Sequence, residues 1–314
     1  MAAQKSSQKS KKNFSGVIAP LITPFGEDGA PDPDRFINHA EWLMTNGCTG
    51  LAPFGTTSEA NSLGLEERME LLEELVDAGI DPVNLLPGTG MCALTDAITL
   101  TQHAVELECG GCLMLPPFYY KGPSEEGLYR YFSEVIEAVG DDRLKVYLYH
   151  IPPIAQVGFT LPLIGRLKKA YPDTVVGLKD SSGDWANTKA ILDAYPDLEI
   201  FPGSEAFLLD GLRAGSSGTI SASANVNPAA LYAVYQNWQS ADADALQAKI
   251  GGVRKVFQSL NMIPFIKAIV AHYRNDPGWA KLRPPFVELP EADVLKAIKI
   301  LESEHGFKMD FGSA

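Results

Sequence analysis

The sequence predicts an α/β fold: a (β/α)8 barrel (TIM barrel) with a C-terminal helical extension. Short apolar runs that end in turn residues recur eight times, and each is followed by a segment with helical periodicity. This alternation is typical of parallel strands joined by right-handed crossovers, and eight such units suit a closed barrel. An open doubly wound sheet is the alternative. It usually begins with a glycine-rich phosphate loop after its first strand, where this chain has Pro20 and Pro24.

The predicted strands are apolar along their length, as strands buried on both faces of a parallel sheet are. They cover Gly16–Phe25, Gly50–Gly55, Asn84–Gly90, Gly111–Pro117, Lys145–Pro152, Val175–Ser181, Leu198–Gly203 and Gly218–Val226. The clearest helical segments between them are Leu65–Ala78, Ala93–Glu108, Glu125–Val139 and Leu161–Ala170. Expected helix boundaries are the N-caps Asp32, Ser124 and Thr160 and the C-terminal glycines Gly79 and Gly140.

Three regions are expected along the chain. Residues 1–13 are polar and basic and predict a disordered tail, and residues 14–240 form the barrel. Residues 241–314 predict a helical appendage, with helices at Leu246–Leu260, Pro264–Tyr273 and Pro290–His305. No linker-like composition separates the appendage from the barrel, so we expect the two to pack together.

Charge and composition exclude several classes of function. The net charge of −13 argues against a nucleic-acid partner, although a locally positive pocket could still bind a small anion. No apolar run is long enough to span a membrane, and the N-terminus lacks the apolar core of a signal peptide. The thiols of Cys48, Cys92, Cys109 and Cys112 are too scattered for a disulfide framework. Without a second Cys or His pair, Cys109 and Cys112 indicate small buried side chains rather than zinc ligands, and reduced thiols fit a cytoplasmic protein.

Lys179 stands at the C-terminal end of the apolar run Val175–Ser181. A charge is costly to desolvate at such a position, and burial favours the uncharged amine, which can attack a ketone to form a Schiff base. The alternative is a lysine whose aliphatic part is buried while its charge reaches solvent. The position alone supports both interpretations equally.

Other strand ends carry groups that suit such chemistry. Thr56 and Thr57 follow the second strand, where two hydroxyls at a turn can bind a carboxylate or, alternatively, cap a helix. Tyr149 ends the fifth strand, and tyrosines here either transfer protons or pack with a solvated hydroxyl. Gly203 and Ile220, at the last two strands, are expected to line the remainder of a pocket. A lysine, a phenol and a carboxylate cradle together predict chemistry on a 2-oxo acid.

Several ordered motifs resemble the dihydrodipicolinate synthase / N-acetylneuraminate lyase family of pyruvate-dependent class I aldolases. They are GTTSE at Gly55–Glu59, PPFYYKGPSEEGLY at Pro116–Tyr129, YHIPP at Tyr149–Pro153, GLKDSSGD at Gly177–Asp184 and GTISASANV at Gly218–Val226. The resemblance covers about residues 14 to 307. It implies a barrel that needs no metal or organic cofactor and that assembles as a homo-oligomer, a tetramer or a dimer.

The resemblance also implies roles for individual residues. Lys179 matches the Schiff-base lysine, Tyr149 the tyrosine that relays protons, and Thr56 and Thr57 the pair that holds the pyruvoyl carboxylate. Tyr119 matches the tyrosine that completes a relay with Thr57 and Tyr149. The adjacent Tyr120 competes for that assignment, and the tyrosine could act in its own subunit or in a neighbour.

The chain departs from the family pattern at the part of the site that would select the second substrate. No arginine stands shortly after Tyr149, in the stretch from His150 to Gly158, where the family's synthases have one that binds the carboxylate of the aldehyde; this argues against a lysine-biosynthetic synthase. The sequence Gly203-Ser204-Glu205-Ala206 matches only partly the lyases that bind polyhydroxylated substrates. Ser58 replaces a glycine of the usual GTTGE, and His150 replaces an asparagine as either a structural residue or a second-substrate contact.

Three functional hypotheses follow. The leading one is a lyase that forms or cleaves a C–C bond beside a pyruvate-derived enamine. The second uses the same iminium to dehydrate or deaminate a sugar-acid or imino-acid substrate. The third, a non-catalytic binder of 2-oxo acids, is disfavoured by the intact lysine, tyrosine and threonine pair.

Overall fold

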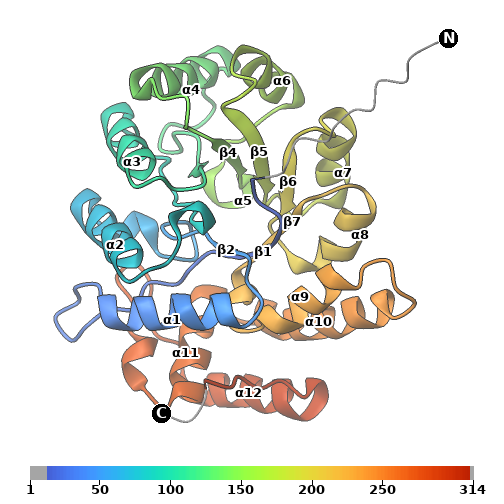
Figure 1. The fold of residues 1–314 in the computed structure, drawn as a ribbon. Coiled ribbons are helices and arrows are strands. Elements are labelled where there is room, and N and C mark those ends of the chain that lie inside the picture. The colour runs from blue at the N-terminus through green and yellow to red at the C-terminus, as the bar shows by residue number, and fades with distance from the viewer. Residues whose placement is uncertain (1–12, 312–314) are drawn as a thin grey trace.

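The computed structural model describes residues 13–311, in which helices surround a ring of strands (Figure 1). The predicted disordered tail at residues 1–13 lies outside the described residues except for Asn13. The backbone N–H of Asn13 donates to the Glu199 carboxylate at 2.7 Å. Tyr147 donates its hydroxyl to the same carboxylate at 2.6 Å, so this end of the barrel interior is closed by a buried polar cluster.

The strands are short and parallel, in two hydrogen-bonded groups with the orders β2-β1-β7 and β3-β4-β5-β6. Within the described residues they are Gly16–Ala19 (β1), Gly50–Leu51 (β2), Cys112–Met114 (β3), Val146–His150 (β4), Val175–Asp180 (β5), Glu199–Pro202 (β6) and Gly218–Ile220 (β7). The first strand ends earlier than predicted, because Pro20 and Pro24 cannot donate ladder hydrogen bonds. The last predicted strand ends early too, where a 3₁₀ turn begins at Ala222.

The third predicted strand, Asn84–Gly90, is not a regular strand, yet it fills its place in the ring. Leu86 donates its N–H to Leu51 of β2 at 2.8 Å, and Leu113 of β3 donates to the Pro87 carbonyl at 2.8 Å. Pro87 has no N–H and therefore interrupts the ladder. On the other side, Ser217 donates to Ile200 of β6 at 2.9 Å. These bonds join the two strand groups, and the predicted barrel is confirmed.

Helices follow the strands in the expected alternation. The barrel helices are Pro33–Thr45 (α1), Leu65–Asp77 (α2), Leu94–Glu106 (α3), Glu125–Val139 (α4), Pro152–Ala155 (α5), Leu161–Ala170 (α6), Trp185–Ala194 (α7), Leu208–Arg213 (α8) and Pro228–Gln236 (α9). Asp32, Ser124 and Thr160 accept hydrogen bonds from backbone N–H groups of the first turns of α1, α4 and α6, which confirms the three predicted N-caps. Gly140 ends α4 in the left-handed conformation, as predicted.

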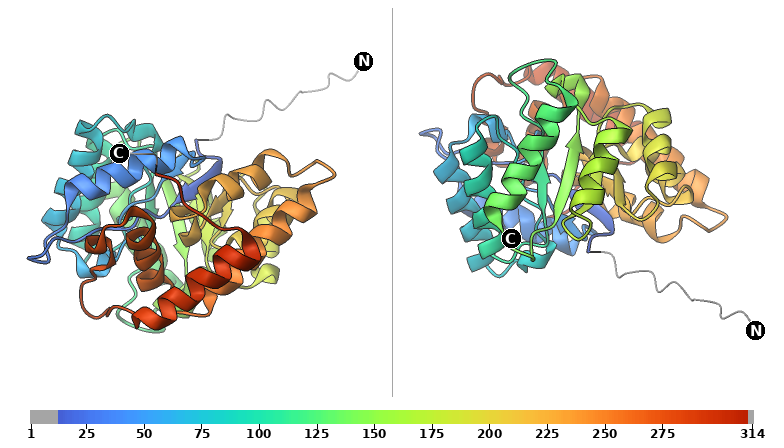
Figure 2. Two further views of the ribbon diagram at one scale, coloured as in Figure 1. Left: turned by 90° about the horizontal axis from the view of Figure 1, so that it is seen from below. Right: turned by 90° about the horizontal axis from the view of Figure 1, so that it is seen from above.

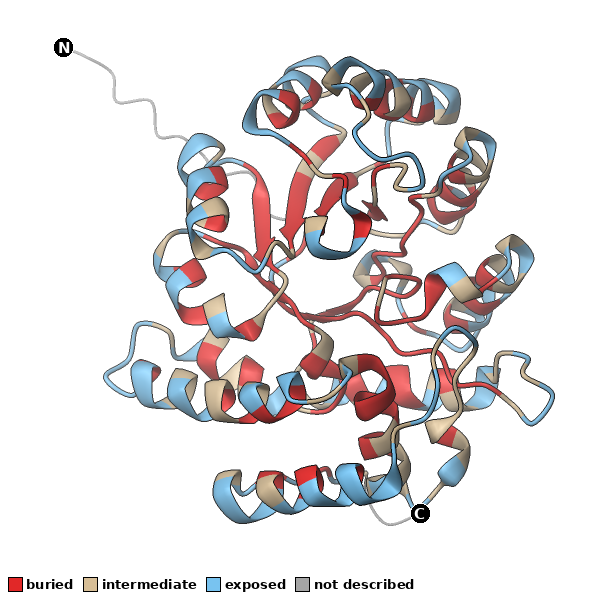
Figure 3. Cartoon of the chain, turned by 180° about the vertical axis from the view of Figure 1, so that it is seen from behind, coloured by how far each residue is buried: buried red, intermediate tan, exposed pale blue. Residues whose placement is uncertain are grey.

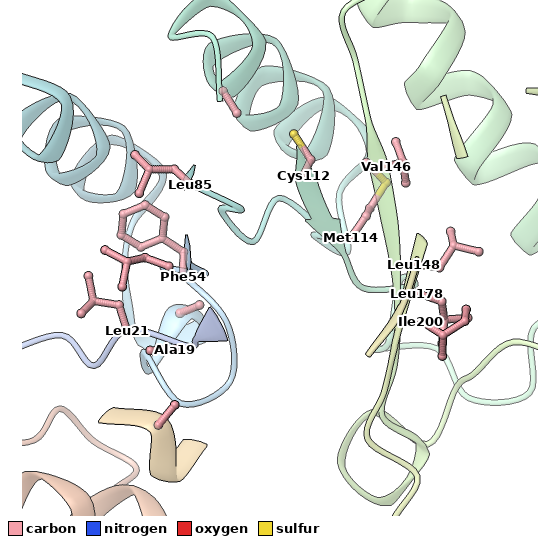
Figure 4. Close-up of a cluster of buried hydrophobic side chains, with 14 of the residues drawn as sticks. Ala19, Leu21, Phe54, Leu85, Cys112, Met114, Val146, Leu148, Leu178 and Ile200 are labelled. Atoms are coloured by element: carbon pink, nitrogen blue, oxygen red, sulfur yellow. The ribbon is translucent and has the colours of Figure 1, made fainter. Parts of the chain in front are cut away.

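Alternation along each strand separates two kinds of side chain. Val146, Leu148, Leu178 and Ile200 belong to the apolar layer between the strands and the helices (Figure 4). Their neighbours Tyr147, Tyr149 and Phe201 belong to a second cluster inside the ring. Lys179, between Leu178 and Asp180 on β5, therefore points into the barrel. The strands are buried along nearly their whole length, and the helices bury the sides that face them (Figure 3).

The C-terminal segment is helical, as predicted, and packs outside the barrel (Figure 2). Its helices are Ala243–Gln258 (α10), Met262–Arg274 (α11) and Glu291–His305 (α12). They share an apolar cluster that includes Phe257, Phe265 and Ile298, together with Ile22 and Val226 from the barrel. Through this cluster the barrel and the appendage bury apolar surface against each other. The expected boundary at residue 240 falls between α9 and α10.

Candidate active site

A pocket of about 370 Å³ lies where the carboxyl ends of the strands meet. Active sites of (β/α)8 barrels occupy this face, because the loops that follow the strands converge there. Six residues predicted from the sequence line it: Thr56, Thr57, Tyr149, Lys179, Gly203 and Ile220. They come from the ends of five strands that are far apart in the sequence, so the fold is what assembles them.

Lys179 is 3% exposed, and its Nζ lies 4.2 Å from the centroid of the Tyr149 ring. The two residues are direct partners in the β4–β5 ladder, so both side chains leave the sheet on the same face. Among the described residues, Lys179 forms no salt bridge. The neighbouring Asp180 is on the opposite face, where its carboxylate accepts from Thr188 Oγ1 at 2.6 Å and from the Ser182 N–H at 2.9 Å. The amine is buried against an aromatic face without a compensating carboxylate.

The Tyr149 hydroxyl lies 3.2 Å from Thr56 Oγ1, within hydrogen-bond distance. Tyr149 is itself 3% exposed; its ring lies against the amine inside the barrel, and its hydroxyl reaches the threonine pair. Thr57 is buried beside Thr56. A phenol that lies next to both an amine and a hydroxyl can transfer a proton between groups bound at either.

The turn that carries the threonine pair is fixed by its own side chains. Gly55 donates its N–H to Ser58 Oγ at 3.2 Å, and the Ser58 carbonyl accepts from Thr23 Oγ1 at 2.8 Å. The positive φ angles in this turn are at Phe54 (61°) and Glu59 (55°), not at Ser58. The serine at the position of the family's glycine is therefore accommodated without backbone strain, and its hydroxyl closes the turn.

A buried ion pair holds the same turn from the appendage side. Glu59 accepts from Lys267 Nζ of α11 at 2.7 Å, and both side chains are 0% exposed. The second Glu59 oxygen accepts from the Arg283 N–H at 3.1 Å. Burial lowers the pKa of Lys267, and the adjacent Glu59 opposes that shift. Because Glu59 follows the threonine pair by two residues, its ion pair with the appendage anchors the turn that carries Thr56 and Thr57.

Tyr119 does not reach the pocket of its own chain. It is 73% exposed, and Tyr120 is 79% exposed, with the two rings 5.3 Å apart in an edge-to-face arrangement. Neither lines the pocket. The expected relay between Tyr119, Thr57 and Tyr149 is therefore not formed within one described chain.

Gly203 and Ile220 complete the walls. A Cβ atom at Gly203 would lie 2.0 Å from Ser181 Oγ, so a side chain here would displace the loop that follows Lys179. Ile220 is fully buried inside the ring. The first keeps the pocket open and the second forms its apolar floor.

His150 points away from the pocket. Its Nδ1 accepts from the Phe159 N–H at 2.9 Å, and the residue is buried between β4 and the loop before α6. Burial lowers its pKa, against the opposing effect of Asp180. A neutral imidazole that accepts a backbone hydrogen bond explains the residue structurally, and the geometry does not support its alternative as a second-substrate contact.

The sequence did not reveal the wall that the appendage contributes. Arg254 and Gln258 of α10 and Asn261 before α11 line the pocket. Arg254 Nη1 donates to Glu205 Oε2 at 3.0 Å, and Glu205 also accepts from the hydroxyls of Ser221 and Ser223. A signal was present. Arg254 follows Ile250 by four residues and precedes Phe257 by three, so it stands on the buried face of a helix where apolar residues are expected.

Within residues 13–311, no group of three or more His, Cys, Asp or Glu side chains is placed to hold a metal ion. Burial raises the pKa of the Cys109 thiol to about 12 and that of the Cys112 thiol further, which disfavours the thiolates that a zinc site needs.

None of the described helices is long and apolar enough to cross a membrane.

Comparison with known proteins agrees with this geometry. Residues 13–304 match the profile described as the dihydrodipicolinate synthetase family. A protein described as an uncharacterized DapA-like lyase from Chloroflexus aurantiacus is 35% identical over 281 residues, which cover 89% of this chain and 93% of the relative.

Solved structures give the same result. A dihydrodipicolinate synthase from Agrobacterium tumefaciens superimposes with a TM-score of 0.86 and 32% identity, covering 92% of this chain and 99% of that one. A prophage protein from Escherichia coli, described as a member of the dihydrodipicolinic acid synthase family in complex with pyruvate, has a TM-score of 0.86 and 26% identity, with coverages of 94% and 99%.

Proposed function

Because the chain belongs to the dihydrodipicolinate synthetase family, a family of class I lyases, we propose that it cleaves or forms a C–C bond through a Schiff base between Lys179 and pyruvate or a related 2-oxo acid. One observation carries the proposal: a buried amine without a carboxylate partner shares a pocket with a phenol and two threonines. Each of these groups has a place in the reaction.

Binding and imine formation use the two threonines and the amine. The hydroxyls of Thr56 and Thr57 hold the carboxylate of the 2-oxo acid, which places its C2 carbonyl beside Lys179. The Lys179 Nζ adds to C2, the carbonyl oxygen leaves as water, and an iminium forms. Burial keeps competing water away from this carbon.

The iminium then withdraws electrons from C3. In the cleavage direction the C3–C4 bond breaks, its electron pair enters the iminium to give an enamine, and C4 becomes a carbonyl. The proton of the C4 hydroxyl is relayed through the Tyr149 hydroxyl, which gives up its own proton as it accepts this one, so that a proton is available for C3 of the enamine. Protonation of C3 and hydrolysis of the imine release pyruvate and restore Lys179. Condensation is the same sequence reversed.

Tyr119 and the assembly state belong to the same proposal. Tyr119, Tyr120 and Ile154 are exposed at the pocket end of the barrel, with Ile154 itself 62% exposed. We propose a homo-oligomer, a tetramer or a dimer, in which such a surface is covered. A relay role for Tyr119 then requires that it act in the pocket of a neighbouring subunit. We place the enzyme in the cytoplasm, in keeping with its free cysteines.

Trapping tests the proposal. Incubation with pyruvate and borohydride should reduce the imine and add the corresponding mass to a peptide that contains Lys179. The variant Lys179→Met should take up no label. A wild-type enzyme that acquires no adduct at Lys179 would contradict the proposed chemistry.

The same iminium could serve a dehydratase or deaminase. Analysis of the products separates the possibilities, because only aldol cleavage releases pyruvate together with an aldehyde. A non-catalytic binder would instead show thermal stabilisation by 2-oxo acids without turnover of any of them.

A further inference from the structure

We propose that Arg254 selects a second substrate that carries an oxyanion, a carboxylate or a phosphate, at the end remote from the reacting carbon. This inference rests on the proposed function, since it names the class of aldehyde that the enamine would meet. Arg254 belongs to the appendage, so its contribution to the pocket is separate from the residues that form the imine.

Arg254 is held in place by hydrogen bonds that occupy only some of its N–H donors. Its side chain is 12% exposed, and the hydrogen bonds it forms in the described structure leave from Nη1, to Glu205 at 3.0 Å and Ser221 at 3.4 Å. Its Nε is buried and has no hydrogen-bond partner among residues 13–311. A guanidinium has five N–H donors in a planar fork that matches carboxylate and phosphate, so donors remain for a ligand in the pocket.

Glu205 is the residue that fixes Arg254, and its carboxylate is 1% exposed. Ser221 donates to one of its oxygens together with Arg254, and Ser223 donates to the other. A carboxylate whose oxygens are already occupied by three donors is poorly placed to accept hydrogen bonds from substrate hydroxyls. Glu205 therefore orients the arginine, and the arginine faces the substrate.

The rest of this wall is also rich in donors. Gln258 lies one turn after Arg254 on α10, and Asn261 precedes α11 without using its side chain to cap that helix. The only acidic residue among the described pocket residues is Asp180, whose carboxylate is occupied by Ser182, Asn187 and Thr188. An oxyanion would meet an arginine and two amides here without a facing free carboxylate.

The position of the arginine also matters. The loop after Tyr149, from His150 to Gly158, contains no arginine, so an anion cannot be bound from that side of the pocket by such a residue. Arg254 offers the contact from the appendage wall. The charged end of the aldehyde is therefore expected to lie toward the appendage wall of the pocket.

Paired aldehydes test this inference. Condensation with pyruvate is measured for succinic semialdehyde against its methyl ester, and for glyceraldehyde 3-phosphate against glyceraldehyde. The first pair reports on a carboxylate and the second on a phosphate. We expect the wild-type enzyme to prefer the charged member of at least one pair in kcat/KM.

Variants connect the preference to Arg254. Arg254→Met alone would leave Glu205 buried without its cation, so Glu205→Gln/Arg254→Met is made as well, and Arg213→Met removes a surface arginine as the matched control. The double variant should lose about 10- to 100-fold in kcat/KM for the preferred charged aldehyde, the worth of hydrogen bonds to a charged group. The neutral partner should change by less than about 3-fold on the same reasoning, and Arg213→Met should behave as wild type.

The outcomes are distinguishable. Equal losses for charged and neutral aldehydes, or no charge preference in the wild type, would overturn the role of Arg254 while the pyruvate adduct at Lys179 still formed. Absence of that adduct in the wild type would overturn the proposed function and this inference together. Retention of the adduct in the double variant, with the charge preference lost, would support both.

Discussion

Two lysines are buried in the part of the chain that the structure describes, and they differ in what faces the amine. Lys267 is fully buried in an ion pair with Glu59, at 2.7 Å, on the appendage side of the turn that carries Thr56 and Thr57. Lys179 lies on the pocket side of the same region, with an aromatic ring 4.2 Å away and no salt bridge among the described residues. Burial is therefore not what distinguishes the lysine that we propose as the nucleophile. Lys267 is held in a structural ion pair by a carboxylate, whereas Lys179 has no such partner among the described residues and is the amine that we propose forms the imine.

The largest expected effect is on the reaction rate and follows from replacing Lys179. Lys179→Met should lower the rate of any lyase reaction on the order of 10⁴-fold or more, because no other group can form the imine. Its melting temperature should stay at or above that of the wild type, because an unpaired buried amine is replaced by an apolar chain. Steady-state rates and thermal unfolding measure the two. Activity near the wild-type level would exclude the mechanism.

The next effect tests the phenol above that amine. Tyr149→Phe should lower kcat by about 10²–10⁴-fold, the usual contribution of one positioned proton-transfer group. Imine formation should persist, since the ring and Lys179 remain, so borohydride trapping serves as the internal control. A loss below that range would assign the proton transfer to another group or to water.

The third prediction concerns the structural lysine. Lys267→Met should lower the free energy of unfolding by about 3–5 kcal/mol, because Glu59 would remain buried without its cation. Glu59→Gln/Lys267→Met should recover much of that loss. In the single variant the KM for pyruvate should rise more than kcat falls, since the threonine pair loses its anchor. Chemical denaturation and steady-state kinetics would measure these effects, and an unchanged stability would show that the pair contributes nothing net.

The effect that is smallest at neutral pH, and grows only on acidification, concerns a second buried group beside the appendage. His39 lies between the rings of Trp42 and Trp279, and burial lowers its pKa from 6.5 to about 3, with Arg274 adding to the shift. Between these values the unfolded chain binds a proton that the folded chain does not. The free energy of unfolding should therefore fall as the pH falls from 6.5 toward 3, by up to about 1.4 kcal/mol per pH unit from this residue.

His39→Gln should make the acid side of the stability profile correspondingly shallower. Denaturant titrations at pH 4, 5 and 7 would measure the difference between the two proteins. Parallel profiles would mean that His39 is not the group that titrates.

Much of the fold could be predicted because alternation and capping are local signals. Asp32, Ser124 and Thr160 cap helices as their side chains suggest. The third strand was harder, because Pro87 interrupts its ladder while Leu86 still bonds to β2. In the site, Lys179 and Tyr149 could be placed side by side from their positions at strand ends and from the motifs. Side chains alternate between the two faces of a strand, and this alternation decides which of them face inward.

What the sequence could not reveal depends on contacts between distant segments. Arg254 is far from the motifs in the chain, and only the packing of α10 against the barrel brings it to the pocket. The Glu59–Lys267 pair likewise joins residues separated by 208 positions. The direction of the Tyr119 side chain, outward at 73% exposure, is set by the loop conformation after β3 rather than by its motif.

The division of the pocket between barrel and appendage has an evolutionary consequence. The groups that we propose for imine formation all precede residue 221, while Arg254, Gln258 and Asn261 come from a later stretch that begins after the α9–α10 connection. Exchange of that stretch between homologues, through recombination in the connection, could transfer a preference for one aldehyde without disturbing the catalyst, provided that the incoming stretch keeps Lys267, whose ion pair with Glu59 anchors the turn of the threonine pair. Diversification of this lineage can therefore proceed by substitution in a single C-terminal segment, and chimeras joined between α9 and α10 are the natural way to reproduce it.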